Sequence, residues 1–181
     1  MRKSLTLLTF GLVAAIVLAD TPESASNEPL RWHVAVQPSG ARVGQSVELV
    51  FTADIATGWI LYSSDFNVDI GPRPARFTFE PAPGLQLVGK VAAVKSLRRK
   101  DRTWRTEYAY FSGRAQFRQK AKLVAPLKSI DGHIDGQTCF EESGLCELFH
   151  QKFSAPLTSG AAISCACSVT SKRVSKSQRT S

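Results

Sequence analysis

The segment SVELVFTADI, residues 46–55, alternates apolar and polar side chains in the pattern that is typical of a half-buried β-strand. Apolar side chains occupy every second position, at Val47, Leu49, Phe51, Ala53 and Ile55. Successive side chains of a strand point to opposite faces, so this segment would turn one face to a core and the other to solvent.

The same period of two continues on both sides of this segment, in short runs that glycine and proline separate. No stripe with the helical period of 3.6 residues stands out beyond the N-terminal segment. Short strands at this spacing, seven to nine of them, predict an all-β fold: a single domain built as a sandwich of two antiparallel sheets. Besides 46–55, the predicted strands are 31–37, 58–63, 77–79, 85–97, 107–111, 113–125, 130–139 and 148–156.

Residues 1–19 have the features of a cleavable secretory signal peptide. Arg2 and Lys3 supply a positive start, residues 5–18 an apolar stretch, and Ala19 a small residue before the cleavage point. A retained membrane anchor is the alternative, but the apolar stretch is short for a bilayer and polar residues follow it at once. We therefore expect cleavage after residue 19 and a periplasmic or secreted protein.

The rest of the chain divides into a polar linker at 20–29, the sandwich domain at 30–157 and a basic tail at 158–181. The tail is rich in Ser, Lys, Arg and Thr, which predicts disorder. The formal net charge of the chain is +8. Much of this charge gathers in the tail and in LRRKDRTWR at 97–105, which we interpret as a solvated loop or a docking patch for an acidic partner. No nucleic-acid module is apparent, and we expect no nucleic-acid partner.

The four cysteines all lie in the last quarter of the chain, where an oxidising compartment would favour disulfides. Cys139 and Cys146 bracket FEESGL, and Gly144 suits a hairpin turn, so the two sulfurs could lie across a hairpin within disulfide reach. Such a bridge can be structural, as most bridges in secreted domains are. It closes so few residues that it would stabilise the fold little, and a short bridge at an edge suits thiol–disulfide exchange.

An ordered set of motifs resembles the N-terminal periplasmic domain of the thiol:disulfide interchange protein DsbD, over roughly residues 30–156. The motifs are Trp32-His33-Val34, GWILYS at 58–63, GPRPARF at 71–77, YFSG at 110–113 and the pair Cys139 and Cys146. The resemblance implies an immunoglobulin-like β-sandwich with a reversible disulfide. That disulfide would take electrons from a thioredoxin-like domain and pass them to periplasmic thiol proteins, including disulfide isomerases and cytochrome c maturation factors.

The resemblance also implies roles for individual residues. Cys146 matches the cysteine that forms the mixed disulfide, and Cys139 matches the resolving cysteine. The family has an aromatic cap loop over its disulfide; Trp104 falls near that place, with Asp101 close by, and Tyr62 could line the site. An ordinary loop anchor is the alternative for Trp104, and a core tyrosine with a satisfied hydroxyl is the alternative for Tyr62.

The sequence departs from the family pattern in several ways. More residues separate the two cysteines than is usual, and Glu147-Leu148 stands in place of a proline pair. The family's membrane electron-conducting domain and thioredoxin-like domain have no counterpart, so we expect electrons from a membrane donor protein in trans. A duplicate that kept the fold and lost the relay would show the same departures.

We therefore expect a monomeric thiol–disulfide relay, enzyme-like in its chemistry, that needs no cofactor and no metal. Its partners would be thioredoxin-like or disulfide-isomerase-type proteins. The alternative is a non-catalytic secreted binding module whose disulfide is structural. Two further features bear on metal binding. Cys165-Ala166-Cys167 could bind a soft ion such as Cu(I), and His33, His133 and His150 match no compact zinc module even with the other cysteines.

Overall fold

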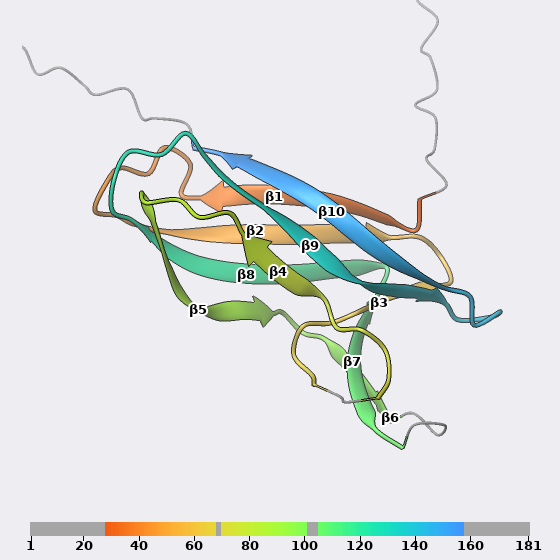
Figure 1. Ribbon diagram of the computed structural model, residues 1–181. Helices are drawn as coiled ribbons and strands as arrows, with labels where there is room; N and C mark the ends of the chain where they lie inside the picture. The colour runs from red at the N-terminus through yellow and green to blue at the C-terminus, as the bar shows by residue number, and fades with distance from the viewer. Residues whose placement is uncertain (1–27, 68–69, 101–104, 158–181) are drawn as a thin grey trace, which may run out of the picture.

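Ten strands, all paired antiparallel, make up the part of the chain that the computed structural model describes, residues 28–67, 70–100 and 105–157 (Figure 1). None of these residues belongs to a helix with the length and apolar character needed to cross a bilayer. The predicted signal peptide, the tail with Cys165 and Cys167, and the predicted cap residues Asp101 and Trp104 lie outside the described residues.

The strands form two sheets that pack face to face, which confirms the predicted all-β sandwich, the architecture of immunoglobulin-like domains. The first sheet has the order β1 (Leu30–Gln37), β2 (Ser46–Ile55), β8 (Arg114–Leu123), β5 (Leu85–Ala93). The second has the order β10 (Cys146–Pro156), β9 (Ser129–Phe140), β3 (Trp59–Tyr62), β7 (Glu107–Ser112), β6 (Leu97–Lys100), and β4 (Arg76–Phe79) also pairs with β9.

Aromatic side chains fill the space between the two sheets. Phe51 of β2 is fully buried, and its ring lies 4.9 Å from those of Phe77 on β4 and Phe153 on β10. Phe117 of β8, also fully buried, lies 5.2 Å from Phe111 of β7. Each pair joins a strand of one sheet to a strand of the other, so these contacts hold the sandwich together.

A polar side chain occupies one core position on β8. Gln119 is 2% exposed, and the pairing of β5 with β8 shifts register between Val88 and Ala92 beside it. The side-chain amide of Gln119 donates to the carbonyl oxygens of Val88 (3.1 Å) and Lys120 (2.7 Å). The buried amide nitrogen is therefore satisfied by backbone carbonyls beside the irregular pairing of β5 and β8.

The segment 97–100 differs from the sequence interpretation. It was predicted to begin a solvated basic loop, but Leu97–Lys100 is strand β6, paired with β7 through Arg99↔Tyr108 and Leu97↔Tyr110. All four of its residues are exposed, so the strand has no alternation of burial by which its sequence could be recognised. In Figure 1, β6 and β7 extend from one end of the sandwich, beyond β3.

Candidate redox-active disulfide site

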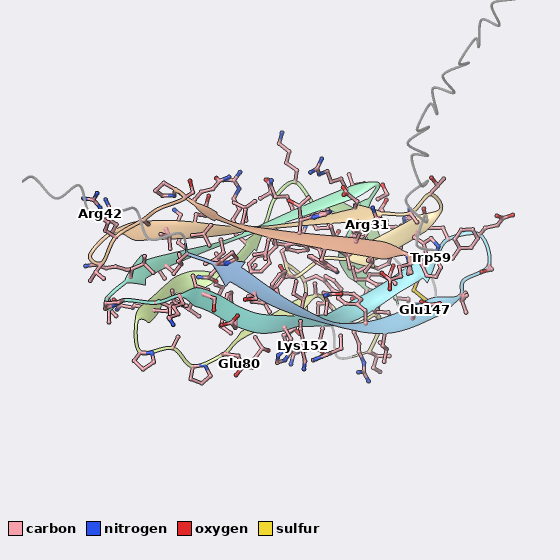
Figure 2. The ribbon with its side chains drawn as sticks, turned by 90° about the horizontal axis from the view of Figure 1, so that it is seen from above. Arg31, Arg42, Trp59, Glu80, Glu147 and Lys152 are labelled. Atoms are coloured by element: carbon pink, nitrogen blue, oxygen red, sulfur yellow. A yellow bond between two sulfur atoms is a disulfide. The ribbon has the colours of Figure 1, made fainter. Side chains whose placement is uncertain are left out.

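The hairpin between β9 and β10 brings Cys139 and Cys146 together as partners in register. The backbone N–H of Phe140 donates to the carbonyl of Leu145 (2.8 Å), so these two residues form a hydrogen-bonded pair. Cys139 and Cys146, the adjacent pair on the side away from the turn, therefore form a non-hydrogen-bonded pair, where opposite strands approach most closely. The Cα atoms of the two cysteines are 4.0 Å apart and their sulfurs form a disulfide. The prediction that the sulfurs lie across a hairpin is confirmed. Figure 2 shows the bridge beside the labelled Glu147.

The two sulfur-bearing residues differ sharply in exposure. Cys139 is 4% exposed, because β9 lies between β10 and β3, whereas Cys146 is exposed at the start of the edge strand β10. An incoming group can therefore reach the bridge from the Cys146 side. A bridge that only staples a fold would more commonly be covered on both sides.

A cluster of aromatic and apolar side chains covers Cys139 on the outer face of the second sheet. Ile60 of β3 is its register partner, and Tyr62 and Tyr108 complete the buried set, with ring centroids 5.2 Å apart. Phe66 and Tyr110 pack against this set. The structure thus places Tyr62 in the same cluster as Cys139. The exposed outer face of a sandwich is usually polar, so an apolar cluster here is a local specialisation.

Arg99 joins β6 to the turn of the cysteine hairpin. Its guanidinium lies 2.7 Å from a carboxylate oxygen of Glu141, donates to the hydroxyl of Tyr110 (3.0 Å) and stacks 4.5 Å from the centre of the Tyr110 ring. The hydrogen bond with Glu141 raises the pKa of Arg99 above its ordinary value, although burial opposes the shift. One carboxylate of the turn between the cysteines, that of Glu141, is therefore paired with a cation. No local sequence pattern pointed to Arg99, since β6 and the hairpin are distant in the chain.

Asp65 anchors the loop that carries Phe66 to the cluster. Burial raises the pKa of the Asp65 carboxyl. Hydrogen bonds from the hydroxyls of Ser63 and Ser96 and the charge of Arg98 outweigh burial, so the pKa falls below its ordinary value. A carboxyl with a lowered folded-state pKa stabilises the fold above its unfolded-state pKa, and this contribution disappears as the pH falls through the folded-state value.

We expect Asp65→Asn to lower the free energy of unfolding by about 1 kcal/mol at pH 6, because the charge-assisted hydrogen bonds weaken. The difference in unfolding free energy between the unsubstituted protein and the variant should narrow as the pH falls below 3.8, the ordinary pKa of the carboxyl. The unfolded chain then takes up a proton that the folded carboxyl, with its lowered pKa, takes up only at lower pH. Urea unfolding at pH 6 and near pH 3 measures both. A gap of equal size at the two pH values would contradict the assigned role, and Ser96→Ala should reproduce part of the effect.

Two exposed leucines flank Cys146. Leu145 precedes it and is 56% exposed, and Leu148 lies on the same strand and is 61% exposed. Large apolar side chains at such exposure beside an accessible sulfur are a suitable contact for another protein surface. In the sequence Leu148 is noted only as a departure from the family pattern, and neither leucine is assigned a contact role, because their exposure depends on the edge position of β10.

No protein-family model matches the chain, and no curated protein matches it either. The solved structures to which the chain is similar include the following three.

One is the N-terminal domain of DsbD from Neisseria meningitidis in the reduced form (TM-score 0.44, 18% identity, 65% of this chain and 80% of that chain). Another is the N-terminal periplasmic domain of ScsB from Proteus mirabilis (TM-score 0.45, 12% identity, 71% of this chain and 45% of that chain). The third is the complex between the DsbD and PilB N-terminal domains of Neisseria meningitidis (TM-score 0.44, 16% identity, 74% of this chain and 84% of that chain). Two of the three contain the family that the sequence resembles.

Proposed function

We propose that this protein is a thiol–disulfide exchange relay in which Cys139 and Cys146 cycle between dithiol and disulfide. The observation that carries the proposal is the asymmetry of the bridge: Cys146 is exposed on an edge strand, and Cys139 is 4% exposed under an aromatic cluster. Exchange needs one sulfur that a partner can reach and a second that stays close enough to resolve the mixed disulfide.

The delivery half of the cycle starts from the dithiol. The Cys146 thiolate attacks one sulfur of the partner's disulfide; a bond between Cys146 and the partner forms, and the partner's second sulfur leaves as a thiolate. The Cys139 thiolate then attacks the Cys146 sulfur, which re-forms the internal bridge and releases the partner's first sulfur as a thiolate. Two electrons have passed to the partner, and the relay is oxidised.

Recharging uses the same atoms in the opposite order. A thiolate of a donor protein attacks Cys146, and Cys139 leaves as a thiolate. The donor's second thiolate then attacks the donor sulfur that is bound to Cys146, which forms the donor's disulfide and releases Cys146 as a thiolate. The side-chain amide of Gln137 has its nitrogen 3.5 Å from the Cys139 sulfur, a position from which it can donate to the leaving thiolate. The oxygen of the same amide accepts from the backbone N–H of Arg73 (3.0 Å), which holds the amide in that orientation. Gln137 therefore acts as a positioning donor to the buried sulfur.

The proposed setting is the periplasm, reached after signal-peptide cleavage. The acceptors and donors are thioredoxin-like or disulfide-isomerase-type proteins, supplied with electrons by a membrane protein in trans, and the relay acts as a monomer. A role in cytochrome c biogenesis is part of this proposal. The exposed side chains of Leu145 and Leu148 support docking of a protein partner, since they offer a small apolar contact beside Cys146.

We expect the Cys139–Cys146 pair to have a reduction potential of about −180 to −270 mV, the range of exchange proteins. The measurement is alkylation of free thiols after equilibration in graded glutathione buffers, read by mass spectrometry. The control is the same chain carrying Cys165→Ser and Cys167→Ser, which should give the same value. A potential below about −300 mV, with the bridge resistant until the protein unfolds, would favour the alternative of a binding module with a structural disulfide.

A further inference from the structure

We propose that His133, Asp135 and His150 form a binding site for a divalent transition-metal ion such as Zn²⁺ on the outer face of the second sheet. His133 and Asp135 are two residues apart on β9 and so project from the same face. His150 is the register partner of Asp135 on β10. Strand pairing thus gathers three metal-ligating side chains from positions that are far apart in the sequence.

The distances suit a shared ion. The Nδ1 atom of His150 lies 2.7 Å from one carboxylate oxygen of Asp135, and the Nε2 atom of His133 lies 3.3 Å from the other. The three ligand atoms all lie within 4.8 Å of one another. Two ligands bound to a tetrahedral zinc ion are roughly 3.4 Å apart, given zinc–ligand distances of about 2.0–2.1 Å. Small rotations of the two imidazole rings would therefore bring the three ligand atoms to a shared ion.

The framework of the site is rigid. All three residues lie within hydrogen-bonded strands, away from the turn, and the two imidazole rings already lie 4.8 Å apart with an angle of 36° between their planes. The side chains are partly exposed, at 27% for His133, 45% for Asp135 and 55% for His150. An ion can therefore reach them from solvent without opening the fold.

The donor set decides which ion is expected. Two imidazoles and one carboxylate suit zinc, copper and nickel, whereas magnesium and calcium prefer oxygen ligands. Three protein ligands leave a coordination position open, and Asp135 and His150 line a groove of about 730 Å³. Two cations, Arg76 and Lys152, are the register partners of Asp135 and His133, and their repulsion of the ion weakens the expected affinity.

This site is separate from the disulfide. Asp135 lies four residues before Cys139 on β9, a distance of about 13 Å along a strand. The sequence does not display this site as a zinc module, because such modules place their ligands at compact spacings, whereas Asp135 and His150 are 15 residues apart.

Calorimetric titration of ZnCl₂ into the oxidised full chain tests the proposal. The chain carries Cys165→Ser and Cys167→Ser, and its two remaining cysteines, Cys139 and Cys146, are joined in the disulfide, so no free thiol can bind the zinc. We expect one ion per chain, and His150→Ala or His133→Ala should weaken binding at least about tenfold, since loss of even an outer-shell partner has that effect. The matched control is His33→Ala, which removes an exposed histidine 3.5 Å from a single carboxylate, Asp54, and should leave binding unchanged.

A second measurement does not depend on any histidine variant folding. In the nuclear magnetic resonance spectrum of the same protein with all histidines present, Zn²⁺ should shift the imidazole signals of His133 and His150 and leave those of His33 in place. The proposal is overturned if no zinc binds, if His150→Ala and His133→Ala bind as tightly as their parent, or if His33 responds as strongly as the other two. None of these outcomes bears on the exchange activity of the cysteine pair, so the two proposals fail separately.

Discussion

Cys139→Ser should form a mixed disulfide with glutathione disulfide through Cys146 in the native protein, at least about a hundredfold faster than Cys146→Ser does through Cys139. The reason is the difference in exposure. Cys146 is exposed on β10, whereas Cys139 is 4% exposed beneath Ile60, Tyr62 and Tyr108. A buried thiol reacts only in the small fraction of molecules that have opened locally.

The experiment uses the full chain carrying Cys165→Ser and Cys167→Ser, so that each variant has a single thiol. Mass spectrometry follows the glutathione adduct with time. The control is the same pair of reactions in concentrated urea, where both thiols are accessible and the two rates should agree. Equal rates in the native state would remove the basis for assigning different roles to the two sulfurs. In Cys139→Ser, a thioredoxin-like partner should also stay trapped on Cys146, because no second thiol can resolve the adduct.

Gly58→Ala should lower the free energy of unfolding by about 3 kcal/mol, a sum of backbone strain and overpacking. Gly58 precedes β3 and has a φ of +81°, which side chains other than glycine rarely adopt. A methyl group there would overlap the ring of Phe140, which packs on Trp59 with ring centres 5.6 Å apart. The carbonyl of Gly58 also accepts from the backbone N–H of Glu141 (2.9 Å), so this turn supports the cysteine hairpin directly.

The matched control is Gly113→Ala. Gly113 has a φ of +69°, but no described heavy atom beyond its chain neighbours lies within 4 Å of the added methyl group. It therefore reports the backbone cost alone, about 1–2 kcal/mol. Urea unfolding measures both variants. Similar losses for the two would show that Phe140 moves aside freely and that the turn does not hold the hairpin. If Gly58→Ala loses more unfolding free energy than Gly113→Ala, the rate at which Cys146 reacts with glutathione disulfide should also change in Gly58→Ala and stay unchanged in Gly113→Ala.

The sandwich and the disulfide pairing were predictable from local patterns. β2 coincides with the predicted 46–55, because a strand with one buried face alternates apolar and polar side chains. This alternation can be recognised in consecutive residues of the sequence. The pairing of Cys139 with Cys146 follows from a short turn containing Gly144, which has a φ of +71°. β6 was missed because all four of its side chains are exposed and its pairing with β7 leaves no alternation in its sequence.

The properties that make this pair a candidate relay have a different origin. Cys139 and Cys146 look equivalent in sequence, and they differ in exposure because β9 is flanked by β3 while β10 lies at an edge. The cover over Cys139 comes from β3, β7 and the loop with Phe66, and the Arg99–Glu141 link comes from β6. Burial and ion pairing depend on segments that are distant in the chain, and the spacing of residues in the sequence does not indicate which strands become neighbours. Strand periodicity is a local property, and the surroundings of a sulfur atom are not.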